Sequence, residues 1–264
     1  MTYLIYLLLG IFAGTLSGLF GIGGGLVIVP TLLFCFKYTS AIPNDLAVYM
    51  AIGTSLAIIL VTVSNSTYRH YKKGGVDKAI VLKLIIPIMI GTAIGAQFSN
   101  TLSPRTLEII FGVYVTLVSL KMLFDKKIEG EMKKTSLLLY SLVGFVIGFK
   151  SAILGIGGGT ISIPFLSWRG VAMKKAVGVS ASLGIPIALI GSTSYILSGM
   201  KVESLPEMSL GYVYLPGFFG VVLTSAYFTK IGAKLSHSLP QERMKKIFVI
   251  FLFIVAFKTF YSLS

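Results

Sequence analysis

Apolar residues form long stretches along the chain, and short polar connections separate them. Stretches of about 18–25 residues are long enough for a helix to cross the roughly 30 Å hydrocarbon core of a bilayer. Two stretches of only about 10 residues would rise roughly 15 Å, half a bilayer. The pattern predicts an all-α polytopic membrane protein. Its apolar segments are 3–20, 26–36, 46–68, 79–99 and 104–124, followed by 137–154, 160–168, 173–198, 209–229 and 241–261.

The composition supports a membrane protein and excludes several other classes. Hydrophobic residues make up 55% of the 264 residues and charged residues only 12%, whereas a soluble domain carries about 25% charged residues. The single cysteine, Cys35, excludes an internal disulfide and a cysteine-based metal site. With two histidines and no aspartate or glutamate expected deep in a span, we expect no cofactor, no metal site and no enzymatic activity.

A duplicated decapeptide divides the chain into two related halves. The sequence GIGGGLVIVP at 21–30 returns as GIGGGTISIP at 155–164, and AIGTS at 51–55 matches AVGVS at 176–180. Because other landmarks recur in the same order, the duplication covers nearly the whole chain. We predict an N-terminal repeat at 1–127, a linker at 128–134 and a C-terminal repeat at 135–264.

Each short segment follows a glycine-rich break, which predicts a re-entrant hairpin with its glycine tip inside the membrane. Three full crossings would accompany the hairpin in each half, so the second half would insert upside down. The predicted inside loops then carry 18 Lys and Arg residues against 4 outside, whereas parallel halves would give 12 against 10. The positive-inside rule therefore favours two inverted repeats, each a re-entrant broken-helix hairpin plus three transmembrane helices. The inside loops are 69–83, 121–134, 168–175 and 230–246.

The two glycine tips are the candidate solute site. The half-helices that follow them would direct their N-termini, and the positive ends of their dipoles, into the protein interior. Free N–H groups at such N-termini bind anions, and transporters with inverted repeats bind solutes between the repeats near the midplane. The alternative is that the glycines only allow close helix packing. The candidates are Gly21, Gly23, Gly24, Gly25, Gly155, Gly157, Gly158 and Gly159.

Four polar residues complete the candidate set. Lys150 lies five residues before the second tip, about 7–8 Å along a helix, and is therefore expected well inside the membrane. A cation there is costly and marks a functional candidate; the alternatives are snorkelling to the interface and a salt bridge. Its counterpart in the first half is Leu16, so the symmetry does not require it. Thr54 and Ser55 belong to a repeated block, and Ser180 occupies the matching place in the second half.

The paired motifs at 21–30 and 155–164, with the AIGTS block at 51–55, resemble the TauE/SafE sulfite exporter family over essentially the full length. The resemblance implies a secondary transporter or permease of the cytoplasmic membrane for small sulfur-containing oxyanions. The second half departs from the Gly-Thr-Ser pattern, because Val179 stands where the first half has Thr54. The hydroxyl of Thr54 therefore has no symmetric counterpart.

These observations lead to one functional hypothesis. The chain would move sulfite, or an organosulfonate such as sulfoacetate, by alternating access of one repeat against the other. A passive anion channel and a non-transporting membrane scaffold or assembly factor remain the alternatives. The expected partners are a small inorganic or organic anion and the lipid bilayer, with a homodimer left open. Nucleic acid is not expected, because the net charge of +14 sits in clusters beside apolar spans, as membrane topology produces.

Overall fold

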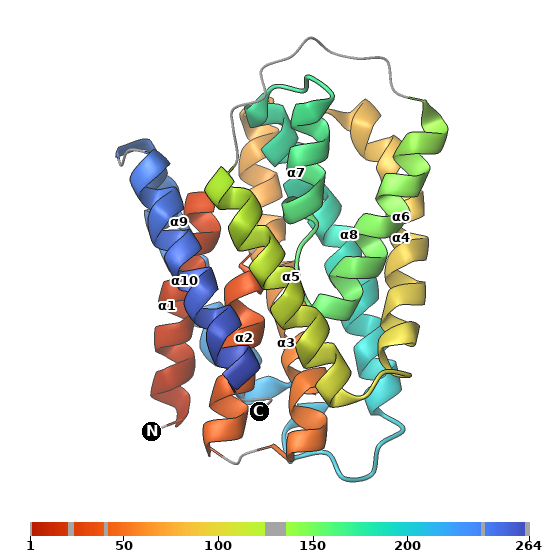
Figure 1. The fold of residues 1–264 in the computed structure, drawn as a ribbon, viewed down its shortest axis with the longest axis vertical. Coiled ribbons are helices and arrows are strands. Elements are labelled where there is room, and N and C mark those ends of the chain that lie inside the picture. The colour runs from red at the N-terminus through yellow and green to blue at the C-terminus, as the bar shows by residue number, and fades with distance from the viewer. Residues whose placement is uncertain (1, 21–23, 40–41, 125–135, 239–240, 262–264) are drawn as a thin grey trace.

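The computed structural model describes residues 2–20, 24–39, 42–124, 136–238 and 241–261, which form ten helices and one short β-hairpin (Figure 1). Five of the described helices, α3, α4, α5, α6 and α8, are long and apolar enough to cross a membrane. The chain is thus an all-α, multi-pass membrane protein, as predicted. The helices are α1 Thr2–Phe20, α2 Gly25–Thr39, α3 Asn44–Lys72, α4 Lys78–Ser99, α5 Pro104–Phe124, α6 Leu137–Leu154, α7 Gly159–Trp168, α8 Met173–Gly199, α9 Leu215–Ser238 and α10 Gln241–Tyr261.

Local chemistry explains several helix boundaries. The Asp77 carboxylate accepts hydrogen bonds from the backbone N–H groups of Ala79 and Ile80 and so caps α4. The Ser136 hydroxyl caps α6 in the same way, and Pro104 supplies the first residue of α5. Such caps satisfy N–H groups that have no partner within the helix, and a proline at this position loses no helical hydrogen bond.

The predicted apolar segment at 209–229 is wrong at its start. A two-stranded antiparallel hairpin of β1 Ser209–Leu210 and β2 Val213–Tyr214 precedes α9. Gly211 in its turn has a φ of 54°, in the left-handed region that favours glycine. A Cβ atom on Gly211 would also collide with the backbone of Ile196 in α8, so the turn lies directly against that helix.

The helix ends fall into two groups at opposite ends of the molecule. The C-terminal ends of α3, α5, α7 and α9 lie at the top of Figure 1, and those of α2, α4, α8 and α10 lie at the bottom. The helix α2 therefore ends on the side where α1 begins, and α7 returns to the side where α6 begins. Both pairs have the course of a hairpin, with α7 10 residues long and α2 15 residues long. The helix α2 is longer than predicted, because it continues to Thr39.

The most extensive helix–helix contacts join the first half of the chain to the second. The helix α1 packs against α9 of the second half, and α6 packs against α4 of the first. Glycines allow both pairs to approach closely: a Cβ atom on Gly14 would lie 2.6 Å from the Cα atom of Ser225. On the other pair, a Cβ atom on Gly148 would lie 2.8 Å from the backbone nitrogen of Thr92. Small residues at such crossings are typical of packed membrane helices.

Candidate functional site

The two glycine tips meet inside the protein. Gly25 begins α2, and a Cβ atom added to it would lie 2.7 Å from the Cα atom of Ile156 and 2.8 Å from the carbonyl oxygen of Gly155. Gly155 ends α6 in a left-handed conformation, with a φ of 65°. The breaks in the two halves therefore contact each other through backbone atoms. Of the other candidates at the first tip, Gly21 and Gly23 lie outside the described residues, and Gly24 has a φ of 77°.

The second tip leads directly into a buried helix N-terminus. Gly157, Gly158 and Gly159 are all buried, and Gly158 precedes the first residue of α7. No side chain caps this helix, although the Gly158 carbonyl accepts from the backbone nitrogens of Ile161 and Ser162. The first N–H groups of a helix have no partner within it. The N-terminus of α7 therefore adds partial positive charge to the protein interior.

Lys150 contacts this N-terminus through a hydroxyl. Its Nζ atom donates to Thr160 Oγ1, in the first turn of α7, at 2.8 Å and to the Tyr114 hydroxyl at 3.0 Å. The same Nζ atom lies 4.8 Å from the centre of the Tyr114 ring. The Tyr114 hydroxyl donates in turn to Thr160 Oγ1, so α5, α6 and α7 meet in one polar cluster. Lys150 is partly buried, and no carboxylate lies within ion-pair distance of it in the described part of the chain.

Sequence reasoning missed both hydroxyl partners of Lys150. A signal for Thr160 was present, because it immediately follows the second tip where the first copy has Leu26. Lys150 likewise stands where the first copy has Leu16. Tyr114 gives no comparable signal: it lies within the apolar α5 and reaches the cluster only through the tertiary fold. The polar cluster thus combines residues from both halves of the chain.

The three hydroxyl candidates occupy three different places, and all are buried. The Ser55 hydroxyl donates to the Gly155 carbonyl at 2.8 Å, which holds α3 against the second tip. The Ser180 hydroxyl accepts from the Ser162 hydroxyl at 2.9 Å and joins α8 to α7. Thr54 Oγ1 accepts from the backbone nitrogen of Tyr214 at 2.9 Å and anchors the β-hairpin. Ser55 therefore lies at the tips, whereas Thr54 lies at the hairpin.

Comparison with known proteins identifies the family of this chain. Residues 6–259 match the family model described as "Sulfite exporter TauE/SafE". The chain belongs to the TauE/SafE family. A "Probable membrane transporter protein" of Haemophilus influenzae is 40% identical over 97% of each chain. A similarly named protein of Methanocaldococcus jannaschii is 29% identical over 91% of this chain and 89% of its own, and one of Bacillus subtilis is 29% identical over 99% and 98%.

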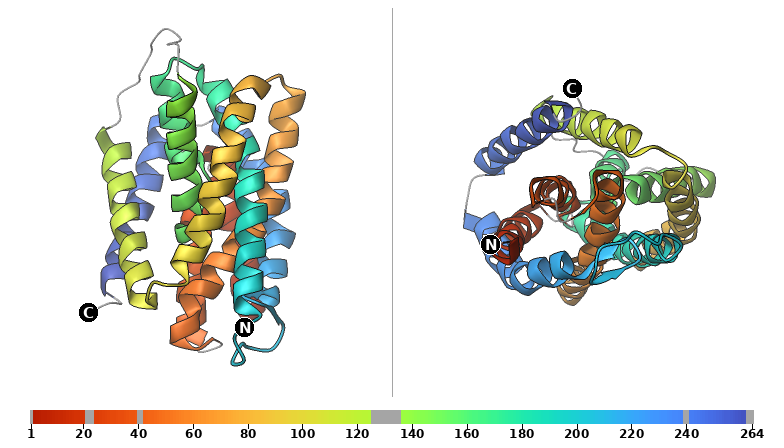
Figure 2. Two further views of the ribbon diagram at one scale, coloured as in Figure 1. Left: turned by 90° about the vertical axis from the view of Figure 1, so that its right-hand side faces the viewer. Right: turned by 90° about the horizontal axis from the view of Figure 1, so that it is seen from below.

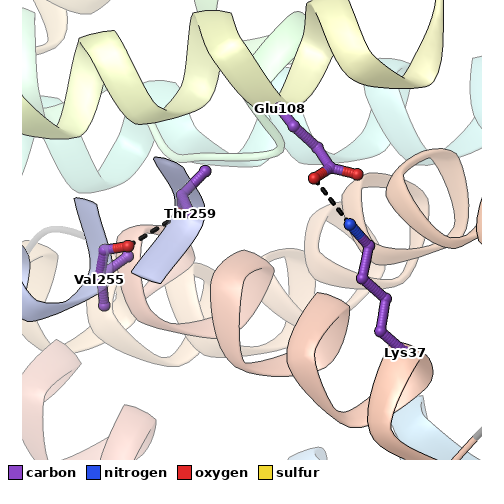
Figure 3. Close-up of polar contacts among 4 residues, drawn as sticks. All are labelled: Lys37, Glu108, Val255 and Thr259. Atoms are coloured by element: carbon purple, nitrogen blue, oxygen red, sulfur yellow. Dashed lines mark hydrogen bonds and ion pairs between the residues drawn. The ribbon is translucent and has the colours of Figure 1, made fainter. Parts of the chain in front are cut away.

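This TauE/SafE member also contains a buried carboxylate near the start of α5. Glu108 of α5 is only 3% exposed and accepts from Lys37 Nζ of α2 at 2.8 Å (Figure 3). This burial was not predicted, because Lys37 lies 71 residues away in the sequence and the two residues meet only in the fold. Buried charges are usually paired in this way.

Replacing Thr54 with valine tests whether this candidate supports the hairpin. The change keeps the shape but leaves the Tyr214 N–H without its acceptor, which should cost about 1–3 kcal/mol. We expect faster amide hydrogen exchange at residues 209–214, with Thr54→Ser restoring protection. Unchanged exchange together with weaker anion binding would instead assign the Thr54 hydroxyl to the solute.

Proposed function

We propose that this protein is a secondary transporter that moves a small sulfur-containing oxyanion across the cytoplasmic membrane by alternating access. Sulfite, or an organosulfonate such as sulfoacetate, would bind where the two glycine tips meet the Lys150 cluster. Membership of a family described as sulfite exporters, and relatives described as probable membrane transporters, support the transport class. The chemistry of the cluster supports the anion.

The uncompensated charge of Lys150 is the observation that carries this proposal. Its described partners are the neutral hydroxyls of Thr160 and Tyr114, and the N-terminus of α7 adds further positive potential beside them. An ammonium inside a membrane protein is costly unless an opposite charge or a strong acceptor compensates it. A bound oxyanion would supply that charge and could also accept hydrogen bonds from α7.

The asymmetry of the repeats favours a single anion site. The places matching Lys150 and Thr160 in the first half are Leu16 and Leu26, both apolar and buried. The N-terminus of α2 therefore has no matching lysine and threonine. The first tip would serve as the opposing wall of the site, held close by the contact between Gly25 and Gly155.

Alternating access would follow from two inverted repeats that share this site. The α1–α2 and α6–α7 pairs run in opposite directions, and α1 and α6 each pack against a helix of the other half. Both features support such an arrangement (Figures 1 and 2). The difference of 18 against 4 cations between the two sides supports it independently. Because each half packs against helices of the other, a movement of one hairpin would be transmitted to the tip of its partner.

Flux measurements on reconstituted protein test the proposed function. Proteoliposomes should accumulate radiolabelled sulfite or sulfoacetate with saturable kinetics and with competition between the two anions. Non-saturating flux without coupling to any gradient would indicate a passive channel instead. A scaffold would give no anion-dependent uptake under proton, sodium or substrate gradients. Either result would overturn the transporter proposal.

A further inference from the structure

A groove of about 490 Å³ lies between α2 and α10, away from the Lys150 cluster on α5, α6 and α7. Both helices end at the same end of the molecule, which the charge distribution assigns to the outside (Figure 1). Apolar and aromatic side chains form most of its walls, among them Phe34, Tyr38, Ile254 and Tyr261. The Thr259 hydroxyl on one wall donates to the Val255 carbonyl of its own helix (Figure 3).

Two cations lie in this groove on a side of the protein that has few. The predicted outside holds only four Lys and Arg residues, and Lys37 and Lys258 both line the groove. Lys37 is paired with Glu108, so Lys258 supplies the net positive charge. Its Nζ atom lies 3.3 Å from the centre of the Phe34 ring, and in the described part of the chain no carboxylate is within ion-pair distance of it. The groove therefore combines an accessible cation with apolar walls.

Several side chains in the walls of the groove are exposed on the surface of the molecule. Phe34 is 44% exposed, Ile254 59% and Tyr261 74%. In a membrane these surfaces lie against acyl chains, and aromatic residues near the ends of the helices suit the level of the headgroups. A small hydrophilic oxyanion would gain little from such walls. An amphiphile with an anionic head and a hydrocarbon tail would fill both parts of the groove.

We propose that the groove between α2 and α10 binds an anionic phospholipid. Its phosphate would lie at Lys258, and an acyl chain would lie along the apolar walls between Pro30 and Ile254. The charges are complementary, because the lipid carries the negative charge that Lys258 lacks among its described neighbours. The helix α2 begins at the first glycine tip and ends in this groove, so a bound lipid would contact the same half-helix that borders the solute site.

Native mass spectrometry of the purified full chain tests this proposal. Wild-type protein should retain more phosphatidylglycerol than phosphatidylcholine of the same chain length. One cation contributes about 1 kcal/mol to attraction by anionic lipid, so Lys258→Met should reduce phosphatidylglycerol retention about fivefold. Phosphatidylcholine retention should not change, and Lys258→Arg should restore the preference. The matched control is Lys201→Met, which removes another exposed cation from the same side but outside the groove.

Four outcomes would overturn the lipid proposal. Equal phosphatidylglycerol retention by wild type and Lys258→Met would show that the lysine does not hold the headgroup. An equal loss in Lys201→Met would indicate general surface attraction. Displacement of the lipid by millimolar inorganic phosphate would identify a free-anion site, and a protein dimer that excludes lipid would identify a second copy as the occupant. Circular dichroism and size-exclusion profiles of the variants exclude misfolding as the cause.

Discussion

Replacing Lys150 with methionine should weaken binding of sulfite or an organosulfonate by about 10- to 150-fold, because hydrogen bonds to charged groups contribute about 1.5–3 kcal/mol. Methionine keeps much of the length of the side chain and removes only the ammonium. The measurement is a thermal-shift titration, since a ligand that binds the folded state raises its apparent stability by RT ln(1 + [L]/Kd). Sulfate, taurine and carboxylates in the same series would define the preferred anion.

The unliganded stability of the same variant separates a solute role from a structural one. A lysine that only held α5, α6 and α7 together through Tyr114 and Thr160 would lower the melting temperature when lost. A lysine whose charge is balanced only by a bound anion destabilises the unliganded protein. Lys150→Met should therefore melt at the same temperature as the wild type or higher. The matched control is Lys83→Met, which removes an exposed lysine whose Nζ atom also lies over a tyrosine ring, that of Tyr140 at 5.4 Å. Unchanged affinity in Lys150→Met would contradict the proposed site.

Hydrophobic patterning predicted most of the fold because each helix is a local feature. The predicted segment 104–124 and α5 coincide, as do 137–154 and α6, since proline or a capping serine marks the start and the apolar run sets the length. The hairpin at 209–214 was not predicted, because its residues continue the apolar pattern of the helix that follows. The features that mark it, the positive φ at Gly211 and the packing of the turn against α8, belong to the folded structure.

The candidate site could be predicted only at residues that stand out in the local sequence. Lys150 was evident as a cation within an apolar span, and the glycine tips were evident as a repeat. Tyr114 and the Lys37–Glu108 pair were not, because their roles depend on helices that meet far apart in the chain. Thr54 belongs to the repeated block, yet its described partner is the backbone of Tyr214, 160 residues away. A duplicated motif therefore marks positions that the fold needs as well as positions that a solute touches.

Replacing Gly155 tests how closely the second tip packs against α3. Gly155→Ala would place a Cβ atom 2.9 Å from the Cα atom of Ile52 in a residue with a φ of 65°. Gly74 has a φ of 66° with nothing within 4 Å of the added atom, so Gly74→Ala reports the backbone strain alone.

We expect Gly74→Ala to lower the free energy of unfolding by about 1–2 kcal/mol, the usual cost of a left-handed non-glycine residue. Gly155→Ala should lose a further 1–3 kcal/mol from overpacking against the α3 backbone. It should also disturb the Ser55 hydrogen bond to the Gly155 carbonyl and slow transport at saturating anion. Dodecyl sulfate titrations followed by circular dichroism measure the stabilities, and proteoliposome flux measures the rate. Equal effects of the two substitutions would mean that Gly155 does not pack against α3 in the membrane, and the placement of Ser55 at the second tip would then be wrong.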